Sequence, residues 1–274
     1  MNKAYSISHL TLLKLSPPEL VRVADVAGYD YVSLRTICMK LGNEPDYSLA
    51  DNPMLYNETK EALEKSHVQF LDIELAKIYD DMDLAHYERE MEVAASLGAK
   101  HVISSIWTDN KAFATEQFAQ LCEMAAQYHL TVELEAVPIS TVKTIAEVRS
   151  ILEKVNAPNQ GMLVDVHHFH RSRESLETLQ KLPREWIHFI HFCDAQLEIP
   201  TTEEEMRRIL REERLYIGEG GIDVRSIVDA LPNVPLSLEI PHLERSNKVS
   251  AEQYALTCLQ SAKSFFQQQY KDIG

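Results

Sequence analysis

The chain has 274 residues, of which 45% are hydrophobic, and its formal net charge is −15. This length suits one large domain or two small ones, and the composition supports a full hydrophobic core and excludes a disordered or fibrous chain. The acidic balance repels phosphate backbones, so we do not expect a nucleic acid as partner.

Cysteine usage and the first residues bear on the compartment. Cys38, Cys122, Cys193 and Cys258 are scattered without a CxxC pair, which is typical of reduced cysteines in a cytosolic protein. The opening MNKAYSISHLTLLKLSPPEL contains no sustained apolar run and no cleavage-site pattern. We therefore expect a cytoplasmic protein without a membrane partner.

Short β-rich runs alternate with longer stretches of helical period along the chain. We expect eight strands, at residues 4–9, 31–35, 69–74, 101–105, 131–135, 161–165, 187–191 and 236–239. We expect helices at residues 17–27, 54–66, 84–97, 111–128, 142–155, 173–182 and 250–270. An additional charged helix at 203–214 precedes the last strand, and it is either a lid over the site or a solvated helix with no role.

This alternation is typical of parallel strands joined by helical crossovers. We predict an α/β protein, a single (β/α)8 TIM barrel domain over residues 1–274. The rival architecture is a doubly wound sheet, which requires a GxGxxG turn after an early strand. The glycine-dense GEGG stretch at 218–221 comes late and follows a helix, so the barrel is favoured.

The last four predicted strands are apolar until their ends, where each carries a residue that can bind a metal. These residues are Glu135 in TVELEAVP, Asp165 in GMLVDVHH, His191 in IHFIHFCDA and Glu239 in PLSLEIPHLE. All strand ends of a barrel open on one mouth, so the four side chains converge. Three buried carboxylates need a shared counter-charge. The set predicts one divalent ion, which is Mn²⁺, Mg²⁺, Co²⁺ or Zn²⁺.

Further polar residues lie near the expected mouth. Glu74 and Trp107 follow early strands and are candidates for contact with a substrate, with core packing as the alternative for Trp107. His168 lies three residues after Asp165, on a loop, and is a better candidate than His188, which alternates out of register with the mouth residues. Glu133 precedes Glu135 by two residues, so both face the same side of the strand, and Glu133 suits a polar layer inside the barrel.

These residues resemble the xylose isomerase-like barrel superfamily of sugar (phosphate) isomerases and epimerases. The shared pattern is a strand ending in Glu (LTVELEA), then D-x-x-H (DVHH, 165–168), H-x-x-D (HFCD, 191–194) and a final LSLEI strand. RLYIGEGGID at 214–223 and AGYDYVSLR at 27–35 also resemble family segments, although Ser33 stands where the family often has Glu. The likeness covers nearly the whole chain and is specific for the superfamily rather than for a substrate.

The resemblance implies roles for individual residues. It implies a metal-ligand set of Glu135, Asp165, His191 and Glu239. Glu135 and Glu239 also match the pair that moves a proton between adjacent carbons, whereas His168 and Arg214 match positions that contact the substrate. Because relatives are commonly dimers or tetramers, a homo-oligomer is compatible with this likeness.

Three function classes compete. The first is a metal-dependent isomerase or epimerase that acts on a small carbohydrate-like molecule (a sugar, sugar phosphate or keto-polyol) through an enediolate. The second is a dehydratase of the inosose or 3-dehydroshikimate type. The 3-dehydroshikimate enzymes resemble a pattern with a His two residues after the Glu of the fifth strand, and Val137 at that position disfavours them. The third is an apurinic endonuclease, which needs three zinc ions and His ligands on early strands, where this chain has SLR and DIEL. A non-catalytic binding protein would not need a full ligand set.

Overall fold

A computed structural model describes residues 3–39 and 44–267. All eight strands are parallel and pair in sequence order, and β1 closes the barrel against β8. The strands are β1 (Tyr5–Ile7), β2 (Tyr31–Leu34), β3 (Gln69–Ile78), β4 (His101–Ile106), β5 (Thr131–Glu135), β6 (Gln160–Asp165), β7 (Ile190–Phe192) and β8 (Leu236–Leu238). The predicted (β/α)8 barrel is thereby confirmed.

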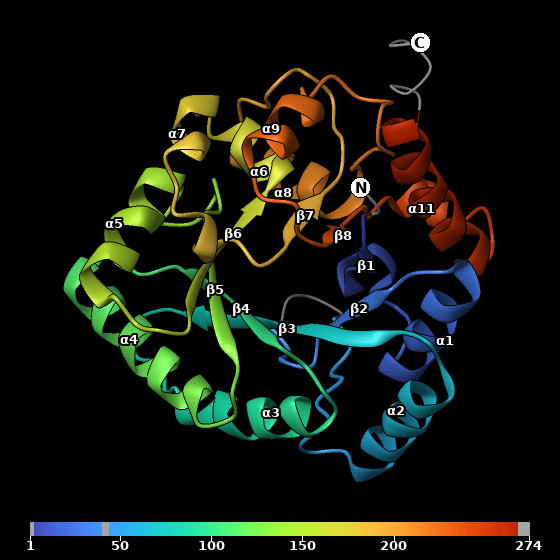
Figure 1. The fold of residues 1–274 in the computed structure, drawn as a ribbon, viewed down its shortest axis with the longest axis horizontal. Coiled ribbons are helices and arrows are strands. Elements are labelled where there is room, and N and C mark those ends of the chain that lie inside the picture. Colours follow the sequence, from blue (N-terminus) through green and yellow to red (C-terminus); the bar gives the residue numbers. More distant parts are fainter. Residues whose placement is uncertain (1–2, 40–43, 268–274) are drawn as a thin grey trace.

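Helices form an outer ring around the strands, as Figure 1 shows. The longer ones are α1 (Pro17–Ala27), α2 (Pro53–Lys65), α3 (Ala85–Ser96), α4 (Lys111–Ala126), α5 (Ile145–Val155), α8 (Glu203–Glu212) and α11 (Ala251–Gln267). The short ones are α6 (Val166–Arg171), α7 (Leu176–Gln180), α9 (Val224–Ala230) and α10 (Leu243–Ser246), with 3-10 turns at His9–Leu12 and Arg184–Trp186. The last residues of the helix predicted at 250–270 lie outside the described ranges.

Local sequence signals set the helix boundaries. At the start of α1, Ser16 and Glu19 form a reciprocal capping box on either side of two prolines, and Gly28 ends the helix in the left-handed conformation at φ 85°. Thr144 and Glu147 form the same box at the start of α5, so this helix begins three residues later than predicted.

Several segments differ from the sequence prediction, and β7 begins three residues later than expected. β3 continues four residues beyond the predicted end and carries Lys77 to the mouth of the barrel. The segment after Asp165, predicted as a loop, is α6, because the Asp165 side chain caps its first turn. Helix α9 was not predicted; its N-cap is Asp223, immediately after the glycine-dense stretch.

The interior of the barrel contains a small apolar cluster of Leu71, Ile103, Leu163 and Phe189, separate from the main core between the strands and the outer helices. The ring of Phe189 lies 5.9 Å from that of His191 and 5.2 Å from that of His101. Phe189 therefore lies between polar groups at the two ends of the barrel. No helix in the described ranges is both long and apolar enough to cross a membrane.

Candidate active site

The four predicted metal ligands converge at the carboxyl-terminal mouth of the barrel. All four side chains are buried. From His191 Nδ1, the distance is 3.7 Å to Glu135 Oε1, 4.0 Å to Asp165 Oδ2 and 3.4 Å to Glu239 Oε2. The strand-end argument from the sequence therefore grouped side chains that are spread over more than a hundred positions of the chain.

The geometry of these donors fits a bound cation. Both ring nitrogens of His191 are buried and lack a hydrogen-bond partner within the described residues. Oxygen and nitrogen ligands that bind one ion at about 2.0–2.2 Å lie roughly 3 to 4 Å from each other, which is the spacing seen around His191. Ligand atoms of Glu135, Asp165 and His191 all lie within 4.8 Å of one another. Glu239 follows β8, which pairs with β7 on the side away from β6, and approaches the same histidine from there.

Arg214 is the nearest positive group to this set. It is completely buried, and its guanidinium forms ion pairs with Asp165 Oδ2 at 2.7 Å and with Glu239 Oε2 at 2.8 Å. Its Nε also donates to the Leu210 carbonyl at the end of α8. Arg214 lines the cavity, as expected for a substrate contact, but the structure also gives it the role of fixing two carboxylates.

These contacts control the protonation of the site. Burial alone would raise the pKa of Glu239, but His191 and Arg214 outweigh it and lower that pKa to about 2. Burial opposes ionisation of Asp165 as well, and Arg214 and His168 hold its pKa well below the usual value. Against burial, the Glu239 and Glu135 carboxylates raise the pKa of His191 well above normal. The carboxylates of Glu239 and Asp165 are therefore ionised at neutral pH.

Helix α6 positions His168. The Asp165 side chain accepts hydrogen bonds from the backbone amides of His167 and His168, so one carboxylate both caps the helix and faces the mouth. His168 Nε2 lies 3.8 Å from Asp165 Oδ2 and 3.9 Å from Glu135 Oε1. His168 is therefore placed to contact a molecule bound beside these carboxylates.

A cavity opens above the donor set. The cavity is lined by the four residues predicted to contact a substrate and by three of the donors. The former are Glu74, Trp107, His168 and Arg214, and the latter are Glu135, His191 and Glu239. Glu74 is held by the Arg35 guanidinium at 2.8 Å, and Ser8 Oγ donates to Glu239 Oε1 at 3.1 Å and Glu74 Oε1 at 3.4 Å. Sequence reasoning missed Ser8, because a serine just beyond a short strand carries no distinctive signal.

Three further cations border the cavity around Trp107 and were also missed. Lys77 Nζ lies 4.3 Å from the centre of a Trp107 ring, and the Arg207 guanidinium carbon lies 5.9 Å from it. Arg211, one helical turn after Arg207 on α8, lines the same cavity. Burial and the neighbouring arginines lower the pKa of Lys77 and that of Arg211. The charged helix therefore places arginines at the mouth; we call Lys77, Arg207 and Arg211 the cationic rim.

Asp194 of the HFCD stretch has a structural role. Its carboxylate accepts hydrogen bonds from the backbone amides of Gly218, Gly220 and Ile222. A Cβ at Gly220 would lie 2.2 Å from Asp194 Oδ1, so a larger residue cannot replace this glycine without displacing the carboxylate. Asp194 thereby fixes the glycine-rich segment that follows Arg214.

Asp72 lies inside the barrel, completely buried, and Ser33 Oγ donates to it at 2.5 Å. Burial raises the pKa of Asp72 to about 8, despite this hydrogen bond.

The stability that the neutral Asp72 carboxyl contributes is full below its unfolded pKa near 4 and is lost as the pH rises to about 8. We expect Asp72→Asn to gain stability over the parent protein by about 2 to 4 kcal/mol between pH 5 and 8. Urea unfolding of chelator-treated protein at both pH values measures this difference, and parallel pH profiles would contradict it.

Comparison with known proteins agrees with the barrel fold. Residues 21–260 match the model of the family described as xylose isomerase-like TIM barrel. The chain belongs to this family. The family resemblance expected from the strand-end residues is thereby confirmed.

Relatives within the family indicate the class of reaction. An inosose isomerase of Bacillus velezensis is 25% identical over 224 residues, which cover 76% of this chain and 75% of that protein. The crystal structure of an IolI protein with a bound zinc atom superposes with a TM-score of 0.77 at 22% identity, covering 94% of this chain and 96% of that one. A D-allulose 3-epimerase of Methylomonas sp., in complex with D-allulose, has a TM-score of 0.68 at 16% identity, covering 96% of each chain. Like these relatives, the protein is an enzyme of the isomerase and epimerase class.

Proposed function

We propose that the protein is a metal-dependent isomerase or epimerase of a keto-polyol or sugar, in which Glu135 and Glu239 move a proton between adjacent carbons. The observation that carries the proposal is the convergence of Glu135, Asp165 and Glu239 on His191, whose ring nitrogens have no hydrogen-bond partner in the described chain. Glu135, Asp165, His191 and Glu239 would hold a divalent ion, which would supply Lewis acidity toward a carbonyl and its neighbouring hydroxyl and so acidify the adjacent C–H bond. The zinc in the IolI structure supports this choice of cofactor.

The two glutamates suit a proton transfer from two sides. Glu135 ends β5 and Glu239 follows β8, three strands away around the closed barrel, so their side chains approach the cavity from different directions. One carboxylate removes a proton and the other returns one to the neighbouring carbon or to the opposite face, through an enediolate. The lowered pKa of Glu239 keeps this side chain ionised at neutral pH, which is the protonation state that the proposed base requires.

The remaining residues of the cavity position the substrate. His168 and Trp107 offer a ring nitrogen and an apolar wall, and Glu74, held by Arg35, offers an acceptor for hydroxyl groups. The likeness to inosose isomerases makes inososes the first substrates to test, followed by ketoses. Val137 lines the cavity at the position where the pattern of the 3-dehydroshikimate dehydratases has a His. This difference disfavours that dehydratase reaction.

The proposal predicts exchange of a substrate proton with solvent. We expect manganese- or zinc-loaded protein to incorporate deuterium from D₂O into an inosose or ketose at the carbon beside the carbonyl, as measured by NMR. An isomer that differs in mass from the substrate only by the incorporated deuterium indicates an isomerase or epimerase, whereas a product that has lost one water indicates the dehydratase. Removal of the ion by a chelator should abolish exchange, and re-addition should restore it. Exchange at full rate in metal-free protein would contradict the proposal.

A further inference from the structure

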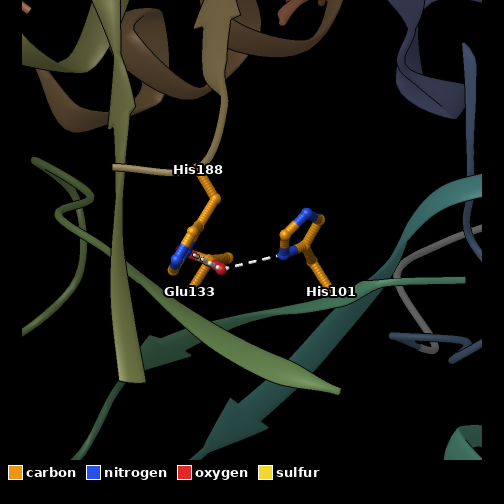
Figure 2. Close-up of side chains that lie close together, drawn as sticks. All are labelled: His101, Glu133 and His188. Carbon is orange, nitrogen blue, oxygen red and sulfur yellow. Dashed lines mark hydrogen bonds and ion pairs between the residues drawn. The ribbon is translucent and has the colours of Figure 1, made fainter. Parts of the chain in front are cut away.

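A second group of metal-ligand side chains lies toward the amino-terminal end of the barrel. His101 opens β4, Glu133 is in the middle of β5, and His188 lies two residues before β7, and Figure 2 shows both imidazoles directed at the carboxylate. Within the barrel, Phe189 contacts the rings of both His101 and His191, so an apolar side chain lies between this group and the mouth. The group is therefore distinct from the candidate active site.

The donor atoms point at one small region. His188 Nδ1 lies 2.7 Å and His101 Nδ1 lies 3.1 Å from Glu133 Oε1. One ligand atom from each of the three residues lies within 4.8 Å of the other two. Thr131 Oγ1 also donates to this carboxylate oxygen at 2.5 Å. The imidazoles are held in place by ring contacts, with 5.3 Å between the stacked rings of His101 and His188. Small shifts would give the spacing of roughly 3 to 4 Å that ligands of one ion require.

The second oxygen of Glu133 is an additional buried polar atom of this group that can take a ligand. The side chain is only 1% exposed, and Oε2 lacks a hydrogen-bond partner within the described chain. It lies against Gly161 of the adjacent β6, where a Cβ would come within 2.0 Å of it. A buried carboxylate oxygen without a partner is costly. Glycine at position 161 thus leaves room for this oxygen and for His188 Nδ1, which a Cβ there would approach to 2.8 Å.

Access and ligand chemistry narrow the choice of ion. The side chains of His188 and His101 are 30% and 13% exposed, so solvent reaches the cluster and a water molecule can complete the coordination. Two imidazoles, one carboxylate and one water are a set that Zn²⁺ binds in tetrahedral geometry, and Co²⁺ substitutes for it.

We propose that His101, Glu133 and His188 form a second divalent-metal site, of the zinc type, separate from the mouth of the barrel. An ion there links β4, β5 and the segment before β7, which are distant in sequence. The proposal does not depend on the proposed catalytic function, because it concerns different residues and is tested without an activity measurement.

Zinc titration of full-length, chelator-treated protein tests this site. We expect Asp165→Asn, altered only at the mouth, to retain one zinc ion per chain, and we expect His188→Gln to bind one ion fewer than the parent protein. His86→Gln, which alters an exposed histidine outside the cluster, is the matched control and should bind as the parent does. In the Asp165→Asn background, zinc at about 100 times Kd should raise Tm by roughly 5 °C. Adding His188→Gln should remove this shift.

Equal zinc stoichiometry and equal Tm shifts with and without His188→Gln would overturn the proposal. Circular dichroism of each variant establishes that it is folded. If His188→Gln does not fold, anomalous diffraction from zinc-soaked crystals of the parent protein decides the matter. A zinc peak between Glu133 and the two imidazoles supports the site, and the absence of a peak there in excess zinc refutes it.

Discussion

Glu239→Gln is expected to lower kcat by about 10²- to 10⁴-fold, because an amide cannot accept the proton that the proposed reaction transfers. The amide retains the shape of the side chain and its hydrogen bond from Ser8, so the barrel should remain folded. Steady-state kinetics together with the deuterium-exchange rate measure the loss. The charge change also weakens the ion pair with Arg214, so the melting temperature must be measured in parallel.

Glu244→Gln is the matched control for this substitution. Glu244 lies on α10, exposed, five residues along the chain from Glu239, and pairs with Lys248 on the surface. It should keep the kcat of the parent protein. Exchange in Glu239→Gln at the parental rate would remove Glu239 from the proton transfer, although it would leave its role as a metal ligand to be measured separately by metal analysis.

Arg214→Met is expected to have the second large effect, on stability rather than on turnover alone. The substitution leaves the buried carboxylates of Asp165 and Glu239 without their guanidinium partner. Breaking a buried ion pair in this way costs about 3 to 5 kcal/mol. We expect this loss in metal-free protein, measured by urea unfolding, and a smaller loss in saturating manganese or zinc, since the ion supplies counter-charge to the same carboxylates.

Arg245→Met provides the comparison for this experiment. Arg245 pairs with Glu219 at the partly exposed surface, where removal of an ion pair costs about 1 kcal/mol or less. A loss in Arg214→Met that is no larger than in Arg245→Met, or one that metal does not reduce, would contradict the inferred competition between the guanidinium and the ion for these carboxylates.

The sequence predicted the barrel and its mouth for a simple physical reason. Parallel strands of a barrel end on one face, so a polar residue after an apolar run can be assigned to the mouth without knowledge of the packing. This holds for Glu135, Asp165, His191 and Glu239, which the structure brings together. Their roles as metal ligands and proton carriers remain predictions.

What the sequence did not predict depends on tertiary contacts. Lys77 reaches the mouth because β3 is longer than its apolar run indicates, and Arg207 does so because α8 folds back over the barrel. His188 was considered within a regular strand, but the chain there precedes β7, so the alternation of the pleat does not determine its direction. Its contact with Glu133 follows from the packing of the barrel and not from the local pattern.

The cationic rim has a consequence for how molecules reach the cavity. The chain as a whole carries a net charge of −15, which repels anions at a distance. Close to Trp107, however, Lys77, Arg207 and Arg211 place three positively charged side chains at the cavity. A negatively charged solute therefore meets a repulsive long-range potential and an attractive short-range one, and added salt screens the former first. Ionic strength thus becomes a variable that separates the capture of charged molecules from that of neutral ones.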